Sequence, residues 1–296
     1  MKIIAASIQQ YHHNGSIFID SLLFLCTGMN ELSIQPLVSI ITIVYNGEKH
    51  LEQTIRSVLD QSYSNIEYFI VDGGSTDQSV PIIIKYESSL AGWVSEADKG
   101  ISDAFNKGIE NTKGSIIGLI NADDWYEKDC VARIVEGMVD HDIAYGDVRF
   151  WKNGQPIFVQ EGNHQLLEKE MTLNHPTVFV KRKCYDREGR FDLNFRFAMD
   201  YDLLLRLFVK GYSFVYIPIV LANMRWEGLS DRQWQKGVKE TLAIKNRYLP
   251  EKHAVHARYY YRHLMAIGFP KLLERVGLGA IPRLYRRFMS RQKKTF

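Results

Sequence analysis

Residues 37–44 read LVSIITIV, and this almost unbroken run of β-branched and aliphatic side chains decides the fold. A strand that is buried on both faces of a parallel sheet carries such a run, whereas a half-exposed strand alternates apolar and polar residues. The next segment, 48–60, places Leu51, Ile55 and Val58 at the spacing of one helix face. The sequence therefore predicts a buried strand followed by an amphipathic helix that covers it.

The same alternation continues to residue 150. The further strands are expected at 66–71, 92–94, 115–120 and 143–148, and the further helices at 81–86, 101–109 and 131–138. Repeated strand–helix units of this length build a parallel sheet with helices on both faces. We therefore expect an α/β fold with a Rossmann-like, mostly parallel central sheet.

After Phe150 the alternation fails. Asn153-Gly154 predicts a hairpin turn. The other elements expected here are a strand at 175–181, a helix at 200–210, a strand at 212–219 that Pro218 closes, and helical, basic sequence from about 230 onward.

Three regions are expected: an N-terminal extension over 1–35, a main domain over 36–228 and a helical, basic C-terminal region over 229–296. Met29 lies just before the first patterned segment, which leaves open whether residues 1–28 are native.

The composition is that of a globular protein. Of the 296 residues 46% are hydrophobic and 24% charged, which excludes disordered, collagen-like and low-complexity classes. Cys26, Cys130 and Cys184 show no CxxC spacing, which excludes a disulfide framework and a zinc ribbon and fits a reducing compartment. Six of the 37 Lys and Arg residues lie in 282–294 without an acid, so the rest of the chain has a net charge near −3. Its charge gives no reason to expect a nucleic-acid partner.

The basic segment 281–294 has the pattern of an amphipathic helix. Its apolar positions recur at helical spacing between arginines; they are Ile281, Leu284, Tyr285, Phe288 and Met289. Such a helix suits an anionic membrane surface, although an ordinary helix docked on the main domain fits equally well. Because no segment reaches the ~20 apolar residues of a membrane span, we expect a cytoplasmic protein that can lie on the inner face of the cell membrane.

Ligands of parallel α/β sheets bind beyond the carboxyl ends of the strands, and this rule selects the loops 45–48, 72–77 and 121–125. In the last loop, Asp123 and Asp124 directly follow the apolar sequence SIIGLI. Adjacent carboxylates repel each other unless a cation offsets their charge, and Mg²⁺ or Mn²⁺ binds one or two carboxylates together with substrate phosphates. The alternative is a solvated turn before a helix, where acids are common anyway.

Asp72 lies at the end of its expected strand. Its carboxylate would project into the crevice and accept a hydrogen bond from a base N–H such as N3 of uracil, although a glycine-rich turn explains the same residues without a ligand. The polar stretch 96–103 opens a further helix, where backbone N–H groups and Lys99 could meet a phosphate or a base. Asp98 or Ser102 could equally be simple caps. Together, three such loops after strands of one sheet favour a crevice for a nucleotide and a metal ion.

Four motifs in this order resemble those of the bacterial family 2 glycosyltransferases, which are inverting enzymes with the GT-A fold. The motifs are PLVSIITIVYNGEKHLEQTIRSVLDQSY, FIVDGGSTD, DKGISDAFNKGI and GLINADDWY, and the resemblance covers about residues 36–226. It implies a GT-A domain, to which the helical sequence from about residue 230 onward adds a C-terminal helical tail. It also implies metal-dependent, inverting transfer of a hexosyl or N-acetylhexosaminyl group from a nucleotide-diphospho-sugar, expected to be UDP-linked. The acceptor would be a hydroxyl of a glycan or lipid-linked molecule in bacterial surface polysaccharide synthesis, lipopolysaccharide included.

The resemblance also assigns residues to the donor. The residues matched to nucleotide contacts are Val44, Tyr45, Asn46, Glu48, Asp72, Asp98, Asn121 and Asp123. Lys99 is added to them because its positive charge could meet a phosphate or a base. Asp123 and Asp124 are expected to bind the metal ion, Mn²⁺ or Mg²⁺. Which of the two is the primary ligand stays open. Asn121 departs from the family, which commonly has Asp there, so one negative charge fewer is available for the metal.

The segment RFAMDYDL at 196–203 resembles the helix start whose aspartate deprotonates the acceptor hydroxyl, and Asp200 is the matching carboxylate. Met199 replaces the acid that usually precedes it. Without the upstream motifs, Asp200 would read as an ordinary acid at a helix N-terminus. Asp202 is expected to pair with Arg206 across one turn on the helix surface.

His175 and Trp125 are the candidates for the acceptor side. A plain turn residue explains His175 as well, and Trp125 could simply pack in the protein. Two other functions stay open. A nucleotidyltransferase would share the crevice but requires a basic, glycine-rich phosphate loop after the first strand, and 45–48 contains no cation. A non-catalytic nucleotide- or sugar-binding protein would explain why Asn121 and Met199 replace acids.

Overall fold

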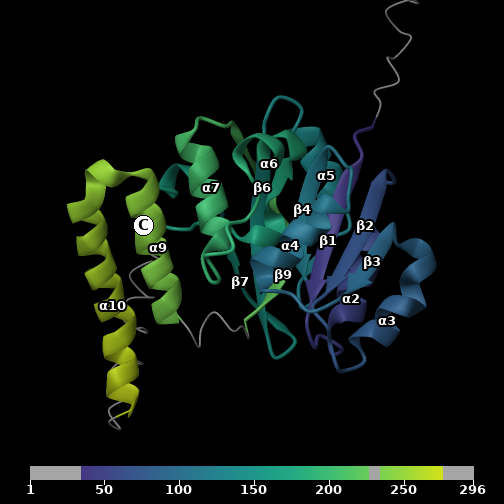
Figure 1. The fold of residues 1–296 in the computed structure, drawn as a ribbon, viewed down its shortest axis with the longest axis horizontal. Coiled ribbons are helices and arrows are strands. Elements are labelled where there is room, and N and C mark those ends of the chain that lie inside the picture. Colours follow the sequence, from purple (N-terminus) through teal and green to yellow (C-terminus); the bar gives the residue numbers. More distant parts are fainter. Residues whose placement is uncertain (1–34, 227–233, 276–296) are drawn as a thin grey trace, which may run out of the picture. The chain divides into compact units, whose positions relative to one another are not determined.

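Strand β1 (Val38–Val44) lies between two parallel neighbours, and all seven of its residues are buried, as its β-branched sequence predicts (Figure 1). It pairs with β2 (Ile66–Asp72) on one side and with β4 (Ile116–Asn121) on the other, and β3 (Gly92–Ser95) extends the parallel part beyond β2. The structure is a computed structural model that describes residues 35–226 and 234–275. The predicted α/β fold is confirmed.

Helices cover both faces of these strands. Successive residues of β1 point to opposite faces of the sheet, and both sets are buried. One hydrophobic cluster contains Ile40 and residues of three helices: α2 (Leu51–Leu59), α3 (Ser79–Tyr86) and α5 (Cys130–Gly137). The other contains Ile41 and residues of α4 (Ile101–Glu110) and α7 (Met199–Val209). Gly108 lets α4 approach the sheet, since a Cβ there would lie 2.3 Å from Ile41 Cγ2. All the helices predicted up to residue 210 are present, with small shifts at their ends.

The remaining strands turn the sheet from parallel to mixed. β6 (Ile143–Lys152) runs parallel to β9 (Phe214–Arg225) but antiparallel to β8 (Phe179–Lys181), which is also antiparallel to β4. β5 (Trp125–Tyr126) pairs antiparallel with β9, and β7 (Gln155–Gln160) with β6. Among the described residues the sheet order is β3-β2-β1-β4-β8-β6-β9-β5, with β7 off this path. The parallel character predicted for the sheet therefore belongs mainly to its first four strands.

The hairpin predicted at Asn153-Gly154 is confirmed, with positive φ angles of 51° and 73° at its two residues. The strand expected at 175–181 was placed too early. It begins only at Phe179, because the 3₁₀ turn η3 (His175–Thr177) precedes it and contains a proline that has no N–H for a strand ladder.

Pro218 does not end the last strand, contrary to expectation, since β9 continues to Arg225. The pairing of β6 with β9 shifts at this point, from Gly146 opposite Ile217 to Asp147 opposite Val220. Pro218 therefore lies in an irregularity of the ladder, where its missing N–H does no harm.

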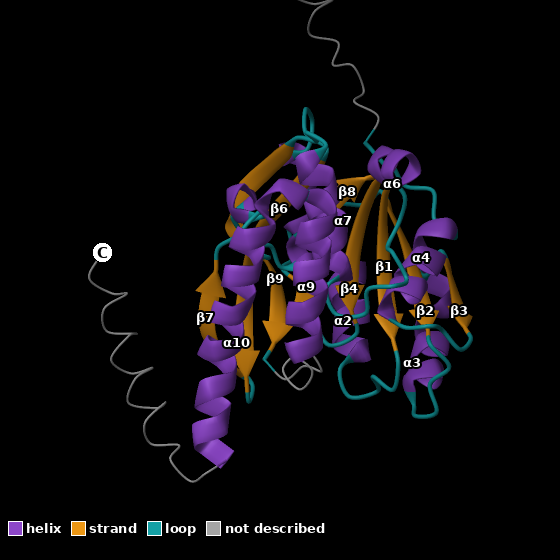
Figure 2. Cartoon of the chain, turned by 60° about the vertical axis from the view of Figure 1, so that its left-hand side comes forward, coloured by secondary structure: helices purple, strands orange, loops and turns teal. Residues whose placement is uncertain are grey.

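Helices α9 (Trp234–Tyr248) and α10 (His253–Arg275) lie side by side, and α9 packs against α7 (Figures 1 and 2). The remaining short elements are α6 (Arg182–Glu188), η1 (Glu87–Ser89), η2 (His164–Leu166) and η4 (Pro250–Lys252). No helix in the described ranges is both long and apolar enough to cross a membrane. Cys130 and Cys184 are buried and unpaired. Cys26 and the segments 1–28 and 281–294 lie outside the described residues.

Asp202 forms the expected pair with Arg206, but its expected place on the helix surface is wrong, because Asp202 is fully buried. The guanidinium of Arg206 lies 3.9 Å from Asp202 Oδ2, whereas the Tyr248 hydroxyl of α9 donates a hydrogen bond of 2.9 Å to Asp202 Oδ1. Arg247 of α9 lies 3.5 Å from the same oxygen. Burial raises the pKa of Asp202. The carboxylate therefore ties α7 to α9, a partner that lies too far along the chain for local spacing to reveal.

Tyr248→Phe should destabilise the protein, because it removes the hydroxyl that donates to buried Asp202. A buried acceptor that loses its donor costs about 1–3 kcal/mol, and urea unfolding followed by circular dichroism would measure this loss. Tyr261→Phe is the matched control, since Tyr261 is 66% exposed on α10. A Tyr248→Phe protein as stable as the Tyr261→Phe protein would contradict the link between the helices.

Candidate active site

The carboxyl ends of the parallel strands meet at one edge of the sheet. Pairing places Val44 of β1 opposite Asp72 of β2, Asp72 opposite Ser95 of β3, and Asn121 of β4 opposite Ile43. The chain builds the sheet in one direction from β1 to β2 and β3, and then returns to the other side of β1 with β4. Such a switch point opens a crevice for ligands in α/β sheets, so the loops after β1, β2 and β4 flank the predicted crevice.

Asp72 is fully buried, and one of its carboxylate oxygens is fixed by the protein. Asp72 Oδ2 accepts hydrogen bonds from the backbone N–H groups of Gly74 (3.1 Å) and Ser75 (2.9 Å) and from the Ser95 hydroxyl (2.7 Å). Asp72 Oδ1 is buried without a hydrogen-bond partner among the described residues. Because an orphaned buried acceptor costs free energy until a donor reaches it, this oxygen is suited to one further N–H group.

Loop 45–48 is fastened to the loop after β2. Asn46 Oδ1 and Glu48 Oε2 each accept a hydrogen bond from a backbone N–H of that second loop, at 2.9 and 2.8 Å. Val44 is buried, whereas Tyr45 is 67% exposed. Of the residues predicted to surround a nucleobase, Asn46 and Glu48 thus shape the loops, and Tyr45 offers an open aromatic surface.

Asp98 lies against the glycine that follows Asp72. A Cβ at Gly73 would lie 2.4 Å from Asp98 Oδ2, so a larger residue there would displace the carboxylate. Asp98 Oδ1 accepts a hydrogen bond of 2.7 Å from the Gly100 N–H, in a turn that requires the positive φ of 116° at Gly100. Lys99 between them is exposed. The structure therefore places Asp98 beside the residue that follows Asp72, at this edge of the sheet.

The loop 121–124 is held by two residues that the sequence analysis missed. The buried Thr54 hydroxyl of α2 lies within hydrogen-bonding distance of two carbonyl oxygens of this loop, at 2.9 and 2.6 Å. The Arg225 guanidinium at the end of β9 donates to the Asp123 carbonyl oxygen. These contacts fix the backbone that presents the two adjacent acids.

The two acids of this loop differ in exposure. Asp124 is 1% exposed and its Oδ2 has no partner among the described residues; burial, and then the charge of Asp123, raise the pKa of Asp124 well above its usual range. Asp123 is half-buried. The described ranges contain no group of three or more His, Cys, Asp or Glu that could hold a metal ion. Since Mg²⁺ or Mn²⁺ needs only one or two carboxylates beside substrate phosphates and water, these residues fit such a cation, and Asp123 is the more accessible ligand.

Asp200 and His175 line one small, mostly apolar cavity. Asp200 is the second residue of α7, and the other walls come from β4, β8, α7 and the aromatic rings of Tyr185 and Phe191. Burial raises the pKa of Asp200 to about 6 and lowers the pKa of His175 to about 4. Near neutral pH the carboxylate is therefore ionised but holds a proton more strongly than an ordinary aspartate, which is the property of a good general base.

Helix α4 connects the crevice with this cavity. It begins just after Asp98, and the buried Ser102 hydroxyl donates a hydrogen bond of 2.9 Å to the carbonyl oxygen of Phe195, shortly before Asp200. One turn later, the ring of Phe105 lies 6.1 Å from the ring of His175. The predicted nucleotide segment and the predicted base thus share one supporting helix, although Asp200 lies in a cavity of its own.

Trp125 is packed on two sides. The Arg225 guanidinium lies 4.5 Å from the centre of its ring, and the ring of Trp151 lies 5.4 Å away. This packing agrees with the structural explanation for Trp125, and its contact with an acceptor stays a prediction.

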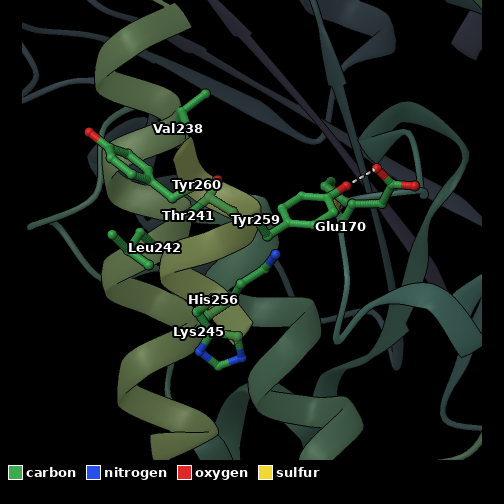
Figure 3. A pocket seen from close by; sticks show the side chains of 9 residues that line it. Glu170, Val238, Thr241, Leu242, Lys245, His256, Tyr259 and Tyr260 are labelled. Carbon is green, nitrogen blue, oxygen red and sulfur yellow. Dashed lines mark hydrogen bonds between the residues drawn. The ribbon is translucent and has the colours of Figure 1, made fainter. Parts of the chain in front are cut away.

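A second cavity, of about 200 Å³, lies between α9, α10 and residues 170–171 (Figure 3). It contains none of the residues that the sequence predicts for the site. In it, the Tyr259 hydroxyl donates to Glu170 at 2.6 Å, and the Lys245 ammonium lies 4.3 Å from the centre of the Tyr259 ring. The predicted chemistry therefore belongs to the sheet edge and to α7.

Comparison with known proteins identifies the family and two relatives of similar length. The model of glycosyl transferase family 2 matches residues 39–205. TuaG of Bacillus subtilis (strain 168), a candidate teichuronic acid biosynthesis glycosyltransferase, is 29% identical over 221 residues, which span 71% of this chain and 87% of the relative. A PGL/p-HBAD biosynthesis glycosyltransferase of Mycobacterium bovis (strain BCG / Pasteur 1173P2) is 28% identical over 221 residues, spanning 72% and 86%.

Two solved glycosyltransferases share the GT-A fold of this chain. S. aureus TarS 1–349 in complex with UDP-GlcNAc superimposes with a TM-score of 0.58 at 17% identity, over 79% of this chain and 75% of that chain. The mannosyltransferase PcManGT from Pyrobaculum calidifontis, in complex with GDP-Man and Mn²⁺, superimposes with a TM-score of 0.60 at 19% identity, over 89% and 82%. The fold agrees with the one that the sequence motifs imply. Since the family model matches more than half of its residues, the chain belongs to glycosyl transferase family 2.

Proposed function

We propose that this glycosyltransferase is inverting and metal-dependent, and that it transfers a sugar from a UDP-linked donor to a hydroxyl of a glycan or lipid-linked acceptor. Family membership makes it a glycosyl-transferring enzyme, so the nucleotidyltransferase and the non-catalytic alternatives are set aside. The observation that carries the proposal is the buried, unpartnered Oδ1 of Asp72 at the switch point of the sheet. Uracil offers an N3–H donor of the kind that this oxygen lacks.

The comparisons support the finer parts of this proposal. The complex of TarS with UDP-GlcNAc supports a UDP-linked donor, and the complex of PcManGT with Mn²⁺ supports a divalent cation. The relatives named for teichuronic acid and PGL/p-HBAD biosynthesis support an acceptor in surface polysaccharide synthesis. A cytoplasmic location, and contact of residues 281–294 with an anionic membrane surface, stay predictions.

In this proposal the chain's own residues divide three tasks. Asp72 accepts the base N–H while Asp98 and loop 45–48 shape the pocket around the nucleotide. Asp123, with Asp124 beside it, would hold Mn²⁺ or Mg²⁺, which when bound offsets negative charge on the diphosphate leaving group. Asp200 takes the proton of the acceptor hydroxyl as the hydroxyl oxygen attacks the anomeric carbon and the sugar–phosphate bond breaks. Attack from the face opposite to the leaving diphosphate inverts the anomeric centre.

His175 is assigned a supporting role on the acceptor side. With a pKa of about 4 its imidazole is uncharged at neutral pH, so it forms no ion pair with Asp200. Its Nε2 is buried without a partner among the described residues. A neutral imidazole can exchange one hydrogen bond with an acceptor hydroxyl and leave the proton transfer to Asp200.

Asp200→Asn should abolish most turnover and leave nucleotide binding intact. Loss of a general base lowers a rate by about 10²–10⁴-fold, whereas the amide keeps the size of the side chain. The measurement is UDP release from UDP-GlcNAc and other UDP-sugars with Mn²⁺, together with UDP affinity by calorimetry. Asp186→Asn is the matched control, because Asp186 is exposed on α6. Equal turnover of the two variants would remove Asp200 as the base.

Turnover should also rise with pH through about 6, because Asp200 must lose its proton before it can act as a base. The other titratable groups in the cavity, His175 and Tyr185, do not change charge in this range, since burial lowers the pKa of His175 to about 4 and raises that of Tyr185. At pH 5 about a tenth of Asp200 is ionised, so the rate should be about a tenth of its plateau. Rates of UDP release, measured from about pH 4.5 to about pH 8, would check this. A flat profile from about pH 5 upward would indicate an ordinary carboxylate or another base.

A further inference from the structure

The backbone that leads into Asp200 is held by a carboxylate from the C-terminal helices. Glu240 of α9 accepts hydrogen bonds from three consecutive backbone N–H groups, those of Arg196 (3.1 Å), Phe197 (2.8 Å) and Ala198 (2.9 Å). Ala198 is the N-cap residue of α7 and makes no side-chain cap. Glu240 thus supplies, from 42 residues further along the chain, one acceptor for the N-cap N–H of Ala198 and for the two N–H groups before it.

Further contacts fix the same segment from two sides. The Arg247 guanidinium of α9 lies 2.8 Å from Asp192 Oδ2 and 4.8 Å from the centre of the Phe195 ring. On the other side, Ser102 of α4 donates to the Phe195 carbonyl oxygen at 2.9 Å. The segment before Asp200 therefore lies between the helix that opens at the nucleotide crevice and the helix that carries Glu240.

This arrangement fixes the backbone at the start of the helix that carries Asp200. Glu240 accepts from the N-cap residue Ala198 and from the two residues before it, while the Tyr201 N–H in the first turn donates a hydrogen bond of 2.7 Å to Asp200 Oδ1. With its start held in this way, α7 places Asp200 in the wall of the cavity that it shares with His175. The negative charge of Glu240 also lies near the positive end of the α7 dipole and offsets part of its field.

We propose that Glu240 is a positioning residue of the transfer reaction, which holds the backbone of 196–198 so that Asp200 faces the acceptor hydroxyl. This inference rests on the proposed role of Asp200 as the base. Glu240 acts through Asp200 and takes no proton from the substrate. The α9 helix thereby becomes part of the machinery that sets the geometry of the reaction.

Glu240→Ala should lower kcat for UDP-sugar turnover about tenfold, because a small displacement of a catalytic group costs at least that much. The KM of the UDP-sugar and the affinity for UDP should not change, since neither involves Asp200. The midpoint of the pH profile should move to lower pH, because the substitution removes a negative charge from the start of α7 and so favours the ionised form of Asp200. Glu240→Gln keeps a carbonyl oxygen that accepts from the same N–H groups, so its kcat should lie between those of Glu240→Ala and the unsubstituted protein.

The matched control is Glu251→Gln, which removes an exposed carboxylate of η4 and should leave kcat and the pH midpoint unchanged. The positioning role is overturned if Glu240→Ala keeps both the kcat and the pH midpoint of the unsubstituted protein. It is also overturned if UDP affinity and thermal stability fall together with kcat, since that pattern marks a general loss of structure. Asp200→Asn, assayed in parallel, separates the two proposals: an active Asp200→Asn protein defeats the base itself, whereas an inactive one beside an unaffected Glu240→Ala protein defeats only the positioning role.

Discussion

The parallel register of β1 with β2 and β4 is the constraint on which the rest of the site depends. Strands that run parallel in one register end at the same edge, so Asp72 and Asn121 come to flank the end of β1 although they are far apart in the sequence. The buried sequence of β1 protects this register, because a slip of one residue would exchange Ile40 and Ile41 between two different hydrophobic clusters. The hydrophobic core thus sets the position of the chemical groups.

Several acids at one edge repel each other, and the protein deals with each of them differently. Asp72 and Asp98 accept hydrogen bonds from backbone N–H groups. Asp124 is buried, and its raised pKa favours the neutral form. Asp123 is left half-buried next to it. These differences reduce the repulsion between the acids at this edge. They leave Asp123 for a cation and Asp72 Oδ1 for a base N–H.

The parts of the fold that could be predicted are those with local periodicity. The β-branched run predicts β1, and the apolar stripes predict α2 and α5, each from neighbouring residues alone. The expected end of a strand such as β2 then locates Asp72. What could not be predicted depends on distant partners. Pro218 is tolerated because β6 and β9 shift register beside it, and Asp202 is buried because Tyr248 reaches it from α9.

Some missed residues left a weak signal and others left none. Thr54 lies on the apolar face of α2, beside Leu51 and Ile55, where a polar residue suggests a buried hydrogen bond. Glu240 gave no signal, since it is one acid in a polar helix and its three backbone donors belong to a segment 42 residues away. The contact that holds the chain before a catalytic helix can therefore come from any part of the chain that the fold brings near.

The proposed site is best tested by a crystal structure of the chain with UDP and Mn²⁺, in which anomalous scattering locates the manganese. In the proposed arrangement, N3–H of uracil donates to Asp72 Oδ1 and Asp123 binds the cation, both at the edge where β1, β2 and β4 end. UDP bound in the cavity between α9 and α10, or manganese bound away from Asp123, would contradict it.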